Sequence, residues 1–462
     1  MNDEYIHTHV LICIRSKIQN HETMDKDPNV AKVSNGRQIK IISTLLPVLT
    51  HVFLLWLYAS PIYRVTNQFK PDVSHPEGLS ADYRMSRLSV FDEGEIYKNP
   101  DTRGTTPLRQ LLTDDYWGKD ISHFNSHKSW RPFSVLCVRG FKNLMGFDND
   151  NEMHFFLEVL YNRYINVIIH TSLAELVSLI GVKLIFPPCN GNDRMERIVT
   201  RAIIKILFGM HPTHVECTAN TANRPHLIGL FCSTLVTLIG CSSDDGMSLL
   251  TRLLVCFIWI IGLCSSETIL FHAPAVCASI LSIILQRTPK KFKNDTYFLK
   301  WSIGKVGFMA VAIFGLSVFY IALRFFIGIE AINPGILTKY QHPFHTFSGL
   351  QRVVNYSYVT SIHIFKASWL DPIGEAHEYG FNSVPEIMFD SFDPRILFPL
   401  FAIGCFGIGA VYCFLESTLI FSLFIAFSTW FATLFPITGA NHVCLNCCSN
   451  YSLISFFSEQ HH

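Results

Sequence analysis

Two adjacent carboxylates, Asp92 and Glu93, begin the stretch of the chain whose residue types are best suited to chemistry. The pair directly follows the apolar dipeptide "VF", which predicts a short anchored segment at a membrane face. A carboxylate can act as a general base when it reaches the proton it removes, and a low-dielectric boundary raises its pKa. The alternative is a solvated acidic turn, the usual role of a lone acidic pair.

The octapeptide "NSHKSWRP" at 125–132 concentrates positive charge and hydrogen-bond donors further along the same stretch. Arg131 offers a planar fork of donors that matches phosphate oxygens, and His127 and Lys128 add donors beside it. Trp130 suits a membrane–water interface. We therefore expect either a site for a phosphate group or an anchor that binds ordinary lipid headgroups.

Further ionisable residues gather at two predicted junctions between apolar segments. The stretch 207–230, "LFGMHPTHVECTANTANRPHLIGL", contains two prolines that can break helices, and "CSSETILFH" forms the second junction. Ionisable groups at membrane depth usually face a cavity or pathway, whereas a lone histidine usually packs or completes a hydrogen bond. The candidate residues of this additional luminal site are His211, His214, Glu216, Arg224 and Glu267.

The composition of the chain indicates which kind of structure must position these residues. Of 462 residues, 49% are hydrophobic and 16% are charged, and the mean hydropathy is +0.28. Soluble domains carry about 25% charged residues, so the chain is typical of an all-α polytopic membrane protein with membrane lipids around it. The net charge of +1 and the lack of a long Lys/Arg face argue against a nucleic-acid partner.

Apolar stretches of about 20 residues mark the expected membrane-spanning helices. We predict about nine of them, give or take about two. They cover 41–62, 165–187, 198–216, 225–242, 250–265, 267–286, 303–326, 396–413 and 416–436.

Short basic loops set the expected orientation of these spans. The loop "QRTPKKFKND" at 286–295 and the basic residues before the first span predict the cytoplasmic side. An odd number of spans then places the long loops 63–164 and 327–395 together on the luminal side. The chain is thereby divided into a disordered cytosolic tail 1–40, a multi-span membrane domain 41–440 and a short Cys-rich luminal tail 441–462.

A series of motifs in this sequence resembles one known family. In order, "FDEGEIYKNPDTRG", "DDYWG", "SHKSWRP" and "SSET" are similar to the membrane half of the transmembrane O-mannosyltransferases targeting cadherins. "LFGMHPTHVE", "ALRFFIGIEAINPG" and "LFPITGA" match more loosely, and the similarity covers roughly 85–440. The resemblance implies a membrane-embedded glycosyltransferase of the GT-C type with a multi-span helical bundle. Family members normally continue into tetratricopeptide repeats, which this sequence does not show.

The resemblance also implies an activity and a set of site residues. It implies a dolichyl-phosphate-mannose–protein mannosyltransferase of the endoplasmic reticulum membrane, which transfers mannose to Ser or Thr hydroxyls of luminal proteins. Asp92 and Glu93 would form the catalytic acidic pair, and His127, Lys128 and Arg131 would lie near the donor phosphate. We expect the lipid-linked donor as a substrate, with no cofactor and no metal ion.

Three positions depart from the family pattern and leave other functions open. Glu93 stands where the family has a second Asp, His226 where it has an Asp, and Ser266 where it has a Lys. A transporter predicts polar residues that continue along the spans to the cytoplasmic side. A non-catalytic membrane scaffold predicts that Asp92, Glu93 and Arg131 can be replaced freely.

Overall fold

The computed structural model of the chain describes residues 28–68, 93–148, 151–186, 194–242, 247–287, 296–327 and 393–416, and isolated positions between 350 and 428. Side chains are described from residue 41 in the first helix and from residue 307 in the helix that begins at residue 296. Asp92, the predicted tail 441–462, and most of the loop 327–395 and the span 416–436 lie outside the described residues.

The regular structure of the described residues is helical, apart from one isolated antiparallel bridge between Asp114 and Asp120. Six helices in this part of the chain are long and apolar enough to cross a membrane, judged by length and composition. They confirm an all-α polytopic membrane protein. These candidate spans are Ile41–Asn67, Glu152–Ile185, Thr221–Ser242, Glu267–Gln286, Gly307–Arg324 and Pro394–Leu415, and Leu249–Ser265 is a shorter apolar helix.

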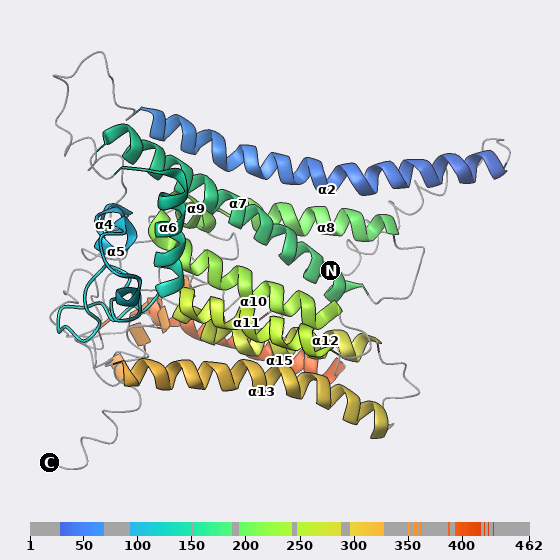
Figure 1. The fold of residues 1–462 in the computed structure, drawn as a ribbon. Helices are drawn as coiled ribbons and strands as arrows, with labels where there is room; N and C mark the ends of the chain where they lie inside the picture. Colours follow the sequence, from blue (N-terminus) through green and yellow to red (C-terminus); the bar gives the residue numbers. More distant parts are fainter. Residues whose placement is uncertain are drawn as a thin grey trace, which may run out of the picture.

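The long helices lie side by side, with their axes roughly aligned (Figure 1). They are α2 (Pro28–Asn67), α7 (Glu152–Ile185), α8 (Arg194–Gly209), α10 (Arg224–Ser242), α11 (Leu249–Ser265), α12 (Ala273–Arg287), α13 (Thr296–Phe326) and α15 (Leu397–Glu416). α7 packs against α2, α8 and α10, and α10 packs in turn against α11 and α12. The bundle is therefore organised around α7 and α10.

Two helices begin before the boundaries predicted from apolar runs. α2 has helical backbone from Pro28, inside the stretch predicted as a disordered tail. α7 begins at Glu152, well before residue 165, because the side chain of Asn151 caps it by accepting two backbone amides. The first turns of α7 carry polar residues buried by other elements, which a search for apolar runs cannot detect.

Short helical turns form both of the junctions that the sequence indicated. The stretch predicted as a span at 198–216 contains most of α8, which ends at Gly209. Pro212 lacks an amide hydrogen and cannot continue a helix, so the chain turns there before α10. The elements of the first junction are η3 (Pro212–His214), α9 (Val215–Ala219) and η4 (Thr221–Asn223), and η5 (Glu267–His272) forms the second, between α11 and α12.

Other short elements gather at one end of the bundle, which we call the loop end (Figure 1). They are α4 (Glu93–Lys98), α5 (Pro100–Arg103), η1 (Leu108–Leu112) and α6 (Pro132–Met145). A small core holds them together and reaches into the first junction. Its buried members are Ile96, Leu111, Tyr116, Val135, Val138 and Ala222.

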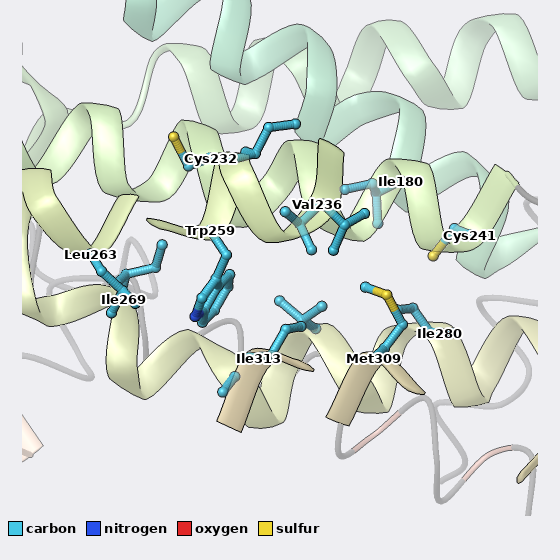
Figure 2. Close-up of a cluster of buried hydrophobic side chains, with 14 of the residues drawn as sticks. Ile180, Cys232, Val236, Cys241, Trp259, Leu263, Ile269, Ile280, Met309 and Ile313 are labelled. Atoms are coloured by element: carbon cyan, nitrogen blue, oxygen red, sulfur yellow. The ribbon is translucent and has the colours of Figure 1, made fainter. Parts of the chain in front are cut away.

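The largest hydrophobic core lies between α10, α11, α12 and α13 (Figure 2). Trp259 of α11 is fully buried, and its indole nitrogen donates to the hydroxyl of Ser317 on α13 at 3.2 Å. Gly262 lets η5 pack closely against α11, because a Cβ at this position would clash with the side chain of Ile269. This core therefore fixes η5 and α13, two elements that carry residues of the candidate site.

Candidate functional site

Glu93 is the first residue of α4, and it is completely buried. Arg163 of α7 forms a two-pronged ion pair with it, with Nη2 2.6 Å from Oε2 and Nε 3.3 Å from Oε1. Thr221 adds two donors to Oε1, its amide at 3.1 Å and its hydroxyl at 2.8 Å. These partners hold the carboxylate in one orientation. We call Glu93, Arg163 and Thr221 the acidic centre.

Asp92, the other member of the predicted acidic pair, lies outside the described residues. It directly precedes Glu93, the first residue of α4, in the sequence. The pair is therefore represented in the described structure by Glu93 alone. Both oxygens of Glu93 accept hydrogen bonds from the protein, which makes this residue the anchor of α4.

Aromatic and apolar groups surround the acidic centre. The hydroxyl of Tyr97 on α4 lies 2.9 Å from that of Thr221, and burial, reinforced by the charge of Glu93, raises the pKa of Tyr97 well above its usual value. A cavity of about 530 Å³ lies between α2 and the 210–219 segment, and Arg163 is the one charged residue in its lining. Because the remaining lining is mostly apolar, the local dielectric is low and the buried ion pair is strengthened.

The carboxylate of Asp115 organises the octapeptide "NSHKSWRP". Its Oδ1 accepts the backbone amides of Trp117 at 2.9 Å and Lys119 at 3.0 Å. Its Oδ2 accepts the hydroxyl of Ser126 at 2.6 Å and the amide of His127 at 3.0 Å. The motif "DDYWG" therefore fixes the backbone of the octapeptide that follows it.

Gly118 makes the tight turn of this motif possible. Its φ of +80° lies in the left-handed region, and a Cβ there would clash with the amide oxygen of Asn99. Asn99 accepts the amide of Asp101 at 2.7 Å and donates to the carbonyl of Tyr116 at 3.0 Å. The segments "NPDTRG" and "DDYWG" are thus locked together.

Lys128 supports the octapeptide from the inside. It is buried, and its Nζ donates to the carbonyls of Ile121 at 2.7 Å and His123 at 3.2 Å. Its φ of +57° is uncommon for a residue with a side chain. The carbonyl of Lys128 accepts a hydrogen bond from Arg324 of α13. The ammonium therefore holds the loop's own backbone, while the carbonyl attaches the loop to α13.

His127 and Trp130 differ in their burial. His127 is exposed, with its ring 5.9 Å from that of Trp117. Trp130 is buried: its indole nitrogen donates to the carbonyl of Leu112 at 3.0 Å, and its ring lies 5.8 Å from that of Tyr320. Trp130 thus packs in the protein interior instead of at a lipid–water interface, while His127 faces outward.

Arg131 forms a bidentate ion pair with Glu267 of η5, with Nε 3.1 Å from Oε2 and Nη2 3.0 Å from Oε1. Its guanidinium also lies over the ring of Tyr116, 5.3 Å from the ring centre. Two residues that the sequence assigned to different sites are therefore one unit. Arg324 joins them through its bond to the carbonyl of Lys128. We call Lys128, Arg131, Arg324 and Glu267 the cationic cluster.

Tyr116 connects the acidic centre with the cationic cluster. Its ring lies beneath Arg131, and its hydroxyl is 3.5 Å from the carbonyl oxygen of Thr221. Thr221 binds the carboxylate of Glu93 through its amide and hydroxyl. A continuous series of contacts therefore runs from Glu93 to Glu267, and both centres belong to one site at the loop end.

Arg224 is a structural support of this site. It is buried, and its Nε donates to the Asn166 side chain at 2.8 Å, while Nη1 and Nη2 donate to the side chain and carbonyl of Asn162 at 2.8 and 2.6 Å. Asn166 also donates to the carbonyl of Asn220 at 3.1 Å. Arg224 thus clamps the start of α10 to α7 and places the turn that carries Thr221.

The structure groups His211 and His214 with His170 of α7, away from Arg131. The ring of His214 lies 5.0 Å from that of His170 and 5.4 Å from that of His211. Glu216 accepts a bond from the side chain of Asn223 at 3.2 Å, within the first junction. Among the described residues, no group of three or more His, Cys, Asp or Glu side chains is placed to hold a metal ion.

The chain is similar in sequence to several protein O-mannosyl-transferases. It is 26% identical to protein O-mannosyl-transferase F38B6.6 of Caenorhabditis elegans over 325 residues, which are 68% of this chain and 40% of that protein. It is 32% identical to protein O-mannosyl-transferase TMTC4 of Mus musculus over 143 residues, or 30% of this chain and 18% of that protein. With protein O-mannosyl-transferase Tmtc1 of Drosophila melanogaster it shares 31% identity over 174 residues, 36% of this chain and 18% of that protein. These relatives are members of the TMTC family, to which the chain is therefore similar in sequence.

The chain spans less than half the length of these relatives, between 18% and 40%. No protein-family model and no solved structure matches it. The comparisons thus show sequence similarity to protein O-mannosyl-transferases, while the multi-pass architecture and the site geometry come from the chain itself.

Four residues of the site did not stand out in the sequence. Arg324 lies in α13, and a charged residue inside a predicted span is a signal that could have found it. Arg163 lies in α7 but just before the predicted span 165–187, so this signal does not apply to it. Tyr116 belongs to the "DDYWG" motif but has no reactive character of its own. Thr221 carries no signal, because its role depends on the turn that brings it to Glu93.

Proposed function

We propose that the chain transfers mannose from dolichyl-phosphate mannose to Ser or Thr hydroxyls of proteins in the lumen of the endoplasmic reticulum. Its sequence similarity to proteins named protein O-mannosyl-transferases supports this class of reaction. The structural observation that carries the proposal is the connection of the acidic centre to the cationic cluster through Tyr116. The reaction needs a base at the acceptor and positive charge at the leaving phosphate, close enough to act on one substrate.

The chemistry is a single displacement at the anomeric carbon. Asp92 removes the proton of the acceptor hydroxyl, and the hydroxyl oxygen forms a bond to the anomeric carbon. The bond from that carbon to the phosphate oxygen breaks, and its electron pair leaves with the polyprenyl phosphate. We assign the base to Asp92 because Arg163 and Thr221 already bind both oxygens of Glu93. Glu93 then positions the backbone that carries the base.

Charge stabilisation supplies the second part of the proposed mechanism. The phosphate gains negative charge as it leaves, and a phosphodiester that is already ionised needs little help from an acid. Arg131 is held rigidly by Glu267 and Tyr116, so its positive charge needs no reorganisation during the reaction. His127 is exposed beside the same loop and adds a donor from the solvent side.

The orientation of the bundle supports a luminal site. α12 follows η5 at the loop end and finishes at Arg287, and the basic loop 286–295 then leads to α13. Basic loops stay on the cytoplasmic side, so the positive charge lies at the end of α12 opposite to the site. The loop end then faces the lumen, where the acceptor proteins are.

Transfer of radiolabelled mannose from dolichyl-phosphate mannose tests the proposal in microsomes that carry the full chain. We expect label on luminal protein, and a loss of about a hundredfold or more in Asp92→Asn, because general bases contribute rate factors of this size. Asp120→Asn is the matched control, since Asp120 lies in the same segment and bonds only locally to Ser122. Full transfer by Asp92→Asn at normal expression would remove the base assignment. No transfer by the wild type to cadherin-like acceptors would favour the membrane scaffold.

A further inference from the structure

Positive charge exceeds negative charge in the cationic cluster. It contains three cationic groups, on Lys128, Arg131 and Arg324, and one carboxylate, on Glu267. Glu267 forms its two hydrogen bonds with Arg131, and Lys128 donates to backbone carbonyls. The charges lie in buried or half-buried positions at the boundary of an apolar bundle, where an uncompensated cation is costly.

Arg324 is the member of this cluster that has a buried hydrogen-bond donor without a partner among the described residues. Its Nη1 donates to the hydroxyl of Tyr320 at 3.2 Å, its Nη2 donates to the carbonyl of Lys128, and its guanidinium lies 5.8 Å from the centre of the Tyr320 ring. Its Nε is buried and has no hydrogen-bond partner among the described residues. Nor does any described carboxylate lie within ion-pair distance of Arg324. A buried guanidinium donor in this position is suited to an anion.

The fixed geometry of Arg324 relates it to Arg131. Tyr320, one turn earlier on α13, packs its ring against Trp130 and donates to the Trp130 carbonyl at 3.5 Å. The segment 128–131, which carries Arg131, is therefore attached to α13 through Tyr320 and Arg324 and to η5 through Glu267. Two guanidinium charges at one segment, together with the Arg324 Nε that lacks a partner among the described residues, suit the oxygens of a phosphate group.

We infer that Arg324 and Arg131 together bind the phosphate of a polyprenyl-phosphate donor, and that Glu267 is the internal carboxylate that holds the Arg131 fork in place. The inference rests on the proposed function for the identity of the lipid. Arg324 is then a catalytic residue that contacts the leaving group. Its charge binds the departing phosphate more strongly than the donor, because the phosphate becomes more negative as the bond to the sugar breaks.

Binding of farnesyl phosphate to the purified full chain in detergent tests the inference without any sugar or acceptor. We expect Arg324→Gln to bind about tenfold or more weaker than the wild type, as for the loss of a charge-assisted hydrogen bond. Arg252→Gln is the matched control, because Arg252 also lies over an α13 ring, that of Phe308 at 5.0 Å, but outside the site. Equal affinity of Arg324→Gln and the wild type overturns the inference, as does a wild type that does not bind farnesyl phosphate.

A second variant should strengthen the binding of farnesyl phosphate instead of weakening it, and misfolding cannot produce tighter binding. Glu267→Gln removes the carboxylate that repels a phosphate in this cluster and that occupies the donors of Arg131. We expect it to bind farnesyl phosphate about fivefold tighter, because close like charges interact with about this energy even in water. Unchanged or weaker binding by a variant that melts as the wild type does contradicts the role given to Glu267.

Competition experiments separate the possible sources of the phosphate. Farnesol and inorganic phosphate should compete poorly, because each lacks one half of the ligand. If phosphatidylserine in mixed micelles displaces farnesyl phosphate at equal concentration, the cluster is a site for ordinary anionic lipids and the donor assignment fails. The same preparation can also be tested for mannose transfer. If its binding of farnesyl phosphate depends on Arg324 but it transfers no mannose, the inference is supported and the proposed function is contradicted.

Discussion

Thr221 donates two hydrogen bonds to the same carboxylate oxygen of Glu93, one from its amide at 3.1 Å and one from its hydroxyl at 2.8 Å. The turn that carries Thr221 lies between α8 and α10, far along the chain from α4. Arg163 adds a third element, α7, to the same carboxylate. One buried side chain therefore joins α4, α7 and the first junction, and this arrangement predicts a structural effect that can be separated from chemistry.

Glu93→Gln should lower the free energy of unfolding by about 3–5 kcal/mol, because it leaves Arg163 as a buried charge without its partner. Thermal unfolding in detergent measures the change. Glu95→Gln is the control on the same helix, since Glu95 is 62% exposed, pairs with Lys98, and should change stability little. A Glu93→Gln protein that melts like the wild type but transfers no mannose would show that Glu93 acts in the chemistry.

Asp115→Ala should loosen the octapeptide while leaving the helices intact. It removes the acceptor of four donors, and buried donors without partners destabilise the segment that carries them. We expect the amides of residues 117–127 to exchange hydrogen for deuterium about tenfold or more faster, as for local opening. Asp120→Ala, which affects only the exposed Ser122 turn, should leave the rates of His127 unchanged. Unchanged exchange in Asp115→Ala would contradict the role assigned to Asp115.

Stability should fall as the pH rises through about 6, because of Asp114. Burial, together with the neighbouring charge of Asp101, raises the pKa of Asp114 from 3.8 to about 6. A carboxyl with a raised pKa in the folded state stabilises the fold when protonated, and this contribution disappears above that pKa. The melting temperature in detergent should therefore be lower at pH 7.5 than at pH 5. Asp114→Asn should flatten this profile, and an unchanged slope in the variant would assign the dependence to other groups.

Gly118→Ala should destabilise the loop end by about 2 kcal/mol or more, since a side chain at positive φ is strained and the new Cβ meets the side chain of Asn99. Gly140→Ala is the matched control, because nothing lies within 4 Å of a Cβ at this helical position, and alanine favours the helix. Unfolding in detergent should rank the control at or above the wild type and Gly118→Ala below it. The reverse order would mean that the turn adapts to a side chain.

The sequence was sufficient for the architecture of the membrane domain and for part of the site. Apolar runs predicted α10, α11 and α15 to within a few residues, because lipid requires long apolar stretches, but they missed the early starts of α2 and α7. Asp115 and Arg131 belong to motifs whose order along the chain reflects a direct contact: the acidic motif folds the octapeptide that carries the arginine. Local sequence patterns describe such local contacts well.

The pairings between distant segments could not be predicted. Arg131 and Glu267 were assigned to separate sites, because nothing in either motif specifies the other as its partner. Lys128 has the residue type of a phosphate ligand, but its ammonium holds the carbonyls of Ile121 and His123. Such choices depend on backbone direction, here on a left-handed residue, and residue type alone does not determine that direction.

The hydrogen bond from Arg324 to the Lys128 carbonyl has a consequence for how the protein is made. The contacts of Asp115 span at most 12 residues, so the turn from Asp115 to His127 can form soon after it is synthesised. Arg324 follows Lys128 by 196 residues, so the cationic cluster is completed only after α13 has been synthesised and inserted. A nascent chain that stalls before α13 therefore holds a locally folded turn without its second arginine. Under the proposed role of Arg324, membrane insertion of α13 is the step that completes the phosphate site.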